Sequence, residues 1–189
     1  MKLDVLQHDD ASRPPSHPWY ADGLKFTCSQ CGNCCTGAPG FVWISKEEIR
    51  RLAEFLRLSP VDVVDRYCRK VNGRFSLNET RTVGGNYDCV FLTEQKVSQT
   101  RKGSDGTPET VVFTRRGCSI YPVRPLQCRT WPFWSENLAS PEAWARSAQR
   151  CHGMNHGRRT FTREQMEALR DATDWPQDPP TSAAGRKTR

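Results

Sequence analysis

The sequence predicts a small, irregular single domain of the α+β class, in which short helices and strands surround a metal centre held by cysteines. Nine cysteines occur in 189 residues, and four of them fall within the eight positions from Cys28 to Cys35. Hydrophobic residues make up 36% of the chain, so the apolar core is thin and bound metal is expected to compensate. Helix caps and short strand-like segments alternate along the chain without an internal repeat.

The composition divides the chain into three parts. Residues 1–22, acidic and then rich in proline, are a predicted flexible arm whose end is fixed to the domain by Trp19 and Tyr20. Residues 23–173 form the predicted cysteine-cluster metal-binding domain. Residues 174–189 are rich in proline and then small and basic, which predicts a disordered tail.

The same composition limits compartment and partners. No stretch approaches the roughly 20 apolar residues of a membrane span, and the N-terminal residues lack the apolar core of a secretory signal. A cytoplasmic location is therefore expected, where reducing conditions keep clustered thiols free to bind metal ions. The net charge of +7 suggests a nucleic-acid partner only weakly, because metal-bound thiolates add negative charge that this count omits. The sequence does not identify a protein partner.

Two short strands and a helix follow the arm. Residues 24–27 are predicted to form a strand that leads into the first cysteine, and residues 41–44 a buried strand. Ser45, with Glu48 three residues later, is a capping box that predicts the start of a helix. The apolar side of this helix repeats at helical spacing through Ile49, Leu52, Ala53 and Leu56.

A second helix is predicted from Ser59 and Pro60, with the serine as N-cap and the proline in the first turn. One face of this helix is expected to carry Val61, Val64, Cys68 and Val71. We therefore interpret Cys68 as a small buried core residue and not as a ninth ligand, because free cysteine packs like a hydrophobic residue.

The middle of the chain alternates between strand-like and turn-like segments. Short strands are predicted at residues 74–77 and 89–92. A polar tip at residues 102–106 joins a strand near residues 96–100 to one at residues 110–114. These segments predict an exposed hairpin.

Two further helices are predicted toward the C-terminus. Ser140 caps the first of them, which carries Trp144 on its inner face and places Cys151 inward at its end. Thr162 with Gln165 forms another capping box, which opens a short last helix.

The cysteine spacing predicts metal binding in preference to disulfides. Two residues between Cys28 and Cys31 let both sulfur atoms face one ion, and Gly32 frees the backbone to turn around it. The neighbours Cys34 and Cys35 could form a disulfide with each other only under severe strain. With Cys68 set aside, the candidate ligands are Cys28, Cys31, Cys34, Cys35, Cys89, Cys118, Cys128 and Cys151.

Eight cysteines are twice the number that a tetrahedral thiolate site needs. Cys34 and Cys35 are expected to point in different directions, so that one completes the clamp of Cys28 and Cys31 while the other reaches a second centre. We predict two adjacent centres or one multinuclear cluster. The sequence does not divide the ligands between them.

Zinc and iron both remain open as the bound metal. Soft thiolates suit zinc and iron–sulfur clusters alike. Cys28, Cys31 and Cys34 reproduce part of the bacterial ferredoxin run, which favours a [4Fe–4S] cluster, but the fourth cysteine followed by proline is missing. The Cys-x-x-Cys-Gly turn is equally common in zinc sites. The predicted cofactor is therefore zinc or iron, with a [4Fe–4S] cluster as one form of the latter.

Charged and aromatic residues are expected to surround this centre. Arg124 and Arg129 flank Cys128, where their charge would offset that of the thiolates. Residues 131–134 are expected to supply a dry aromatic shell. His152 and His156 are not needed as metal ligands when eight cysteines are available, and they are expected in polar loops.

The segment from Phe26 to Gly37 resembles the C-x-x-C-x-x-C-C signature of the bacterial YkgJ-type cysteine cluster proteins, which are described as zinc- or iron-chelating. The likeness continues through residues 89–92, 118–121 and 124–133 and at Cys151. It covers roughly residues 24–155 and implies eight metal-ligating cysteines. Cys68 lies outside the family pattern.

Three functions follow as hypotheses. The first is a cytoplasmic metal-binding protein whose metal supports the fold or carries one electron. The second is an iron–sulfur enzyme of redox or protein methyl transfer, because flagellin lysine methylases carry a similar cluster; no S-adenosylmethionine motif, P-loop or G-x-S-x-G is present here. The third is a metal-stapled RNA- or ribosome-binding module that uses the basic tail and Arg115, Arg116, Arg158 and Arg159.

Overall fold

Six α-helices and four small antiparallel sheets make up the described part of the chain, which confirms the predicted α+β class. The structure, a computed structural model, describes residues 17–104 and 106–173. The predicted basic tail and the first 16 residues of the predicted arm lie outside these residues. None of the described helices combines the length and the apolar composition that a membrane crossing requires.

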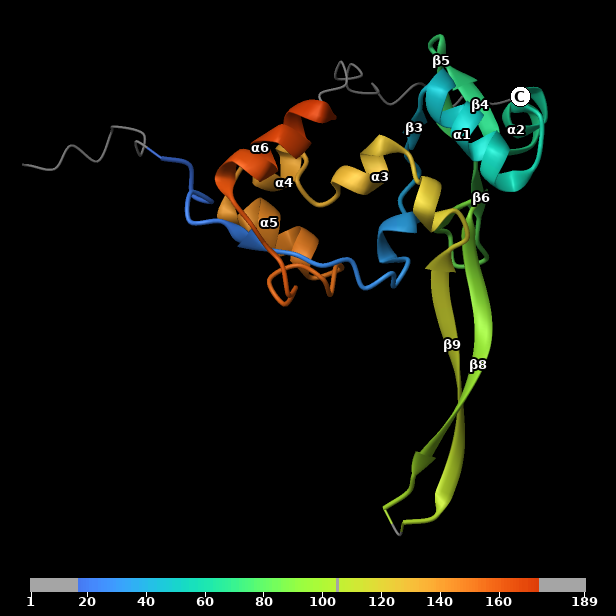
Figure 1. The fold of residues 1–189 in the computed structure, drawn as a ribbon, viewed down its shortest axis with the longest axis vertical. Helices are drawn as coiled ribbons and strands as arrows, with labels where there is room; N and C mark the ends of the chain where they lie inside the picture. Colours follow the sequence, from blue (N-terminus) through green and yellow to red (C-terminus); the bar gives the residue numbers. More distant parts are fainter. Residues whose placement is uncertain (1–16, 105, 174–189) are drawn as a thin grey trace, which may run out of the picture.

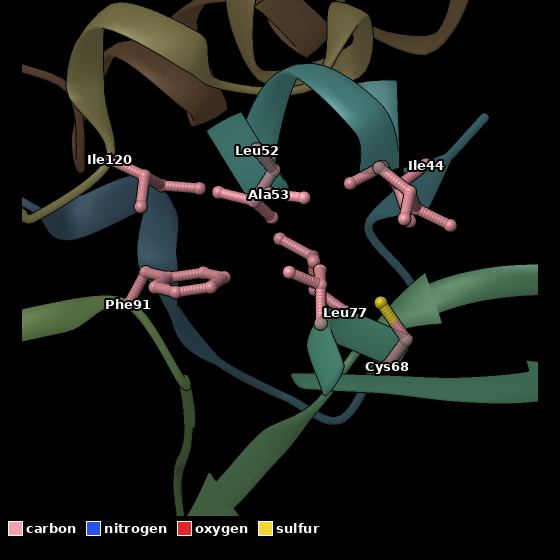
Figure 2. Packing of buried hydrophobic residues seen from close by; sticks show 9 residues of the cluster. Ile44, Leu52, Ala53, Cys68, Leu77, Phe91 and Ile120 are labelled. Atoms are coloured by element: carbon pink, nitrogen blue, oxygen red, sulfur yellow. The ribbon is translucent and has the colours of Figure 1, made fainter. Parts of the chain in front are cut away.

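The first hydrophobic cluster lies between two helices and a three-stranded sheet, shown in cyan and green in Figure 1. The helices are α1 (Lys46–Leu56) and α2 (Pro60–Tyr67). The sheet has the order β3 (Trp43–Ile44), β5 (Arg74–Leu77) and β4 (Cys68–Val71). Figure 2 shows how its side chains meet. The buried members of this first cluster are Ile44, Ile49, Leu52, Ala53, Val63, Cys68, Leu77, Phe91 and Ile120.

Local capping chemistry starts both of these helices as predicted. The Ser45 hydroxyl accepts a hydrogen bond from the Glu48 N–H at 3.1 Å, and the Glu48 carboxylate accepts one from the Ser45 N–H at 2.9 Å. Ser59 caps α2 in the same way, with Asp62 in the third position. Each box satisfies two backbone donors that a helix start would otherwise leave unpaired.

The prediction that α2 continues to Val71 is wrong. The helix ends at Tyr67, and the next four residues form β4, which pairs with β5 along its whole length. Asn72 and Gly73 both have positive φ angles, of 48° and 81°, and form the tight turn between the two strands. This Asn-Gly turn therefore prevails over the helical periodicity. Val61, which the prediction placed on the inner face, is 69% exposed.

The second hydrophobic cluster is built from both ends of the described chain. β1 (Leu24–Lys25) pairs with β10 (Thr160–Phe161), and α4 (Ser135–Leu138), α5 (Pro141–Ala148) and α6 (Arg163–Ala172) surround it. The buried members of this second cluster are Tyr20, Phe26, Phe133, Leu138, Trp144, Met154, Phe161 and Met166.

The end of the predicted arm is fixed in this second cluster, as expected. Tyr20 is buried, and the Trp19 indole N–H donates a hydrogen bond to the Leu138 carbonyl at 2.8 Å. The Thr162–Gln165 capping box at the start of α6 is also confirmed. Cys151 is not part of α5, which ends three residues earlier.

A long hairpin extends away from the rest of the molecule in Figure 1. Its strands, β8 (Leu92–Lys102) and β9 (Pro108–Cys118), pair from end to end, which confirms the predicted hairpin with longer strands. A three-stranded sheet of β2 (Thr36–Gly37), β7 (Tyr87–Cys89) and β6 (Glu79–Arg81) lies near its base. The predicted strand at residues 89–92 is interrupted between β7 and β8.

Replacing Glu48 with alanine is expected to destabilise the folded protein by about 2–3 kcal/mol. The buried carboxylate accepts hydrogen bonds from the N–H groups of Ser45 and Leu126, at 2.9 and 2.6 Å, and its loss leaves these donors without a protein partner. Urea unfolding of the metal-loaded protein measures the change. The control is Glu47→Ala, whose carboxylate is 54% exposed and contributes little. Equal losses in the two variants would contradict this role of Glu48.

Candidate metal centre

All eight candidate cysteines line one pocket of about 50 Å³. The pocket lies where the two hydrophobic clusters meet, because Cys89 and Cys118 pack against the first cluster while Cys28 and Cys151 pack against the second. Every cysteine of the chain is a free thiol. The pocket is therefore lined by cysteines from five separate parts of the sequence, the segment 28–35 and the single positions Cys89, Cys118, Cys128 and Cys151.

The turn after the first two cysteines has the backbone conformation that the spacing predicted. Gln30 and Gly32 have positive φ angles of 56° and 74°, and the Gln30 N–H donates to the Cys28 sulfur at 3.4 Å. A Cβ atom on Gly32 would lie 2.7 Å from the Leu92 side chain. Glycine is thus favoured here by its positive φ angle, and a larger residue would also have to displace the Leu92 side chain at the hairpin base.

Backbone pairing brings Cys28 and Cys151 to the same side of the pocket. The Thr27 N–H donates to the Gly153 carbonyl at 3.1 Å, and the Asn155 N–H donates to the Lys25 carbonyl at 2.9 Å. The Trp131 indole N–H points at the Cys151 sulfur at 3.4 Å. An N–H group directed at sulfur is the kind of hydrogen-bond donor that orients the sulfur of a metal-bound cysteine.

Cys34 and Cys35 both lie in a short 3₁₀ helix, η1 (Asn33–Cys35), and their sulfur atoms are 3.9 Å apart. The prediction that these two side chains diverge is therefore wrong. The contact couples their protonation, because the hydrogen bond between the two sulfurs lowers the pKa of Cys34 to about 7 and raises that of Cys35. One of the pair thus loses its proton readily while the other keeps it.

Burial makes charged thiolates costly at three other cysteines of the pocket. It raises the pKa of Cys89 to about 11 and also raises the pKa values of Cys118 and Cys128. Neighbouring thiols add to the effect. Such a set of sulfurs becomes anionic at neutral pH only when a cation is present to offset the charge, which is the setting of a structural thiolate site.

One arginine of the predicted pair supplies positive charge to this pocket. Arg124 lines the pocket, and its charge adds to the lowering of the Cys34 pKa and partly offsets the burial that raises the pKa values of Cys118 and Cys128. Its guanidinium lies 3.6 Å from the centre of the Tyr121 ring, and its Nε donates to the Tyr121 carbonyl at 3.0 Å. This stacking holds the charge beside the sulfur atoms.

Arg129 is turned away from the pocket. Its Nε donates to the Arg124 carbonyl at 3.0 Å, and its Nη2 lies 3.6 Å from the Glu48 carboxylate. Arg129 therefore supports the loop that carries Arg124, and it is not among the residues that line the pocket.

The aromatic segment at residues 131–134 divides between pocket and core. Trp131 lines the pocket, whereas Pro132 and Phe133 are buried and Phe133 belongs to the second cluster. Trp134 lines an adjacent pocket of about 240 Å³, which Trp131 and four of the cysteines also line. His152 and His156 do not line the cysteine pocket.

The donor set fits a zinc or iron centre in its chemistry, since soft thiolates bind both metals. Within residues 17–104 and 106–173, no three cysteine, histidine or carboxylate side chains already stand at the spacing of a formed metal site. The pocket gathers the thiols, and closing them around an ion requires rotation of cysteine side chains about their Cα–Cβ bonds.

Cys68 lies in the first cluster and does not line the pocket, which confirms its interpretation as a core residue (Figure 2). Burial raises its pKa to about 11, so it is a neutral thiol at pH 7. We expect Cys68→Ala to leave the metal content unchanged and to cost about 1 kcal/mol of stability through lost packing. Metal analysis and urea unfolding check the two halves of this prediction. A lower metal-to-protein ratio would show that Cys68 is a ligand.

Sequence reasoning did not identify several residues that shape this site. The Tyr121 ring holds the Arg124 guanidinium in place by stacking, and Leu92 packs on Gly32. Gly153 and Gly157 let residues 26–27 approach, since a Cβ atom at either would lie within 2.2 Å of that backbone. Glycines close to a cysteine were the available signal for the last two.

Two of the basic residues considered for RNA binding, Arg116 and Arg159, have partners within the protein. Arg116 lies 3.1 Å from Glu94 and 3.6 Å from Asp88, and Arg159 stacks on Phe161 at 4.2 Å. Arg115 and Arg158 are exposed. The basic tail lies outside the described residues.

Comparison with known proteins shows which protein family the chain resembles. Residues 27–152 match the domain described as "CxxCxxCC: Putative zinc- or iron-chelating domain". The "Uncharacterized protein MJ0661" of Methanocaldococcus jannaschii is 32% identical over 114 residues, which cover 60% of this chain and 48% of that protein. The chain thus spans about half the length of the curated relative that it matches. No solved structure matches.

Proposed function

The chain belongs to the CxxCxxCC family of zinc- or iron-chelating domains, and we propose that it is a metal-binding protein whose eight pocket cysteines hold zinc or iron. The observation that carries this proposal is the convergence of these eight cysteines, and not the ninth, on one pocket. Thiolate ligands, N–H groups aimed at sulfur and one stacked arginine together supply what a buried anionic metal centre needs.

The metal has a structural role in this proposal. The pocket lies between the two hydrophobic clusters, so ligands from both sides would be held together by the ion. Structural metal sites contribute directly to the free energy of folding. Iron in the same position, including a [4Fe–4S] cluster, would add one-electron redox chemistry.

We also propose a cytoplasmic location. Nine free cysteines within one small chain remain reduced in a compartment that maintains thiols, and an oxidising compartment would favour disulfides among them.

A second candidate function, an enzyme with a metal centre, is favoured by the adjacent pocket of about 240 Å³. This pocket has aromatic walls, to which Phe41, Tyr87 and Trp134 contribute. Its volume exceeds that of a cavity that holds benzene, about 150 Å³. A small substrate could therefore lie beside the sulfur ligands.

Anaerobic purification, followed by analysis of metal and acid-labile sulfide and by a visible absorption spectrum, tests the proposal. Colourless protein with about two zinc ions per chain, the number that eight thiolates hold, indicates a structural centre. Brown protein with iron and sulfide indicates the redox form. Protein that binds neither metal, as purified or after anaerobic addition of either, overturns the proposal.

A further inference from the structure

We propose that the eight cysteines divide into two sets of four, each of which holds one metal ion. The first set is Cys34, Cys35, Cys89 and Cys128. The second set is Cys28, Cys31, Cys118 and Cys151. This division rests on the proposed metal-binding function and specifies which thiols share an ion.

The distance between Cys34 and Cys35 places these neighbours on the same ion. Their sulfur atoms are 3.9 Å apart. Four sulfurs bound tetrahedrally at about 2.3 Å from zinc are about 3.8 Å from one another. In a [4Fe–4S] cubane each iron takes one cysteine, so cysteine sulfurs lie farther apart than on one ion. The observed spacing is that of one edge of a mononuclear site.

Strand pairing adds Cys89 to this first set. β2 and β7 pair antiparallel with Thr36 opposite Asp88, and Cys35 directly precedes β2 while Cys89 ends β7, so both cysteines lie at the same end of this strand pair. A side-chain rotation is sufficient to bring two such thiols onto one ion.

Cys128 joins the first set through the helix α3 (Leu126–Thr130). The neighbouring Gln127 side chain accepts a hydrogen bond from the Trp43 N–H at 2.8 Å and donates one to the Phe41 carbonyl at 3.1 Å, which fixes this helix against residues 41–43. The larger, adjacent pocket is lined by four cysteines, and these are the members of the first set.

The remaining four cysteines meet around the turn at residues 28–32. Gly32 packs on Leu92, and Leu92 is paired with Cys118. On the other side, Thr27 is hydrogen-bonded to Gly153, two residues after Cys151. The turn therefore lies between the segments that carry Cys118 and Cys151, and none of its thiols lines the adjacent pocket.

Pairs of substitutions that remove the same number of thiols separate this division from a single cluster. The probe is zinc, counted by native mass spectrometry on the full chain. The within-set variant Cys35→Ser/Cys89→Ser is expected to retain one zinc ion, and so is Cys31→Ser/Cys151→Ser. The cross-set variant Cys35→Ser/Cys151→Ser damages both sites and is expected to retain none. Cys68→Ser is the control and should retain two.

A second measurement covers the case in which a double variant does not fold. Cadmium-113 NMR of the cadmium-loaded chain is expected to give two resonances. Cys35→Ser and Cys89→Ser should shift or remove the same resonance, and Cys31→Ser and Cys151→Ser the other one. Equal zinc loss in within-set and cross-set variants, or single substitutions that disturb both resonances alike, overturns the division. Wild-type protein without metal instead refutes the proposed function.

Discussion

Removal of the metal by a chelator is expected to unfold the protein, with loss of its far-ultraviolet circular dichroism and of its melting transition. The pocket takes Cys89 and Cys118 from the side of the first hydrophobic cluster and Cys28 and Cys151 from the side of the second. Without an ion, the buried thiols hold these sides together only weakly. Structural zinc contributes about 10–16 kcal/mol in small domains, more than the total stability of most domains.

The measurement compares the native and chelator-treated protein in one buffer, with metal added back in excess as the control for damage by the chelator. Recovery of the signal on metal addition is expected, because binding and folding are coupled. A metal-free sample that keeps its full dichroism and its melting temperature would contradict a structural role for the metal.

The second large effect is expected from Gly157→Ala. A Cβ atom at this position would lie 2.2 Å from the Phe26 carbonyl carbon and from the Thr27 backbone nitrogen, where no side chain can move aside. The two segments must separate, which moves Cys28 away from Cys151. We expect a loss of about 3 kcal/mol, the upper part of the usual range for overpacking, together with reduced metal retention.

The matched control is Gly40→Ala, since a Cβ atom there meets nothing within 4 Å. Urea unfolding gives the change in stability, and metal content after dialysis gives retention. If Gly157→Ala were as stable and as rich in metal as Gly40→Ala, the close approach of these two backbones would not be required for the site.

Local signals in the sequence were sufficient for most of the helix starts and for the hairpin. The capping boxes at Ser45 and Thr162 depend on residues three positions apart, so they can be identified without knowledge of the fold. The end of α2 could not be predicted from periodicity alone. It depends on pairing between β4 and β5, for which the turn at Asn72 and Gly73 was the local sign.

The membership of the candidate site was predictable, and its internal arrangement was not. Cys68 was separated from the other eight cysteines by the apolar face predicted for residues 61–71 and by its place outside the family pattern, and it lies in the core although the helix ends before it. The proximity of Cys35 to Cys89 depends instead on the register of β2 and β7, two very short strands that have no alternating pattern. Similarly, Arg124 and Arg129 are equivalent in the sequence, and only the stacking on Tyr121 distinguishes them.

The X-ray absorption spectrum of the purified protein at the edge of its bound metal tests most directly whether these cysteines are the ligands. If the eight pocket cysteines hold zinc, the first shell contains only sulfur, about four atoms per ion at about 2.3 Å. A sulfur-only shell is likewise expected for iron. Nitrogen or oxygen atoms in that shell, for example from His152 or His156, would contradict the assignment of the metal to the cysteines alone.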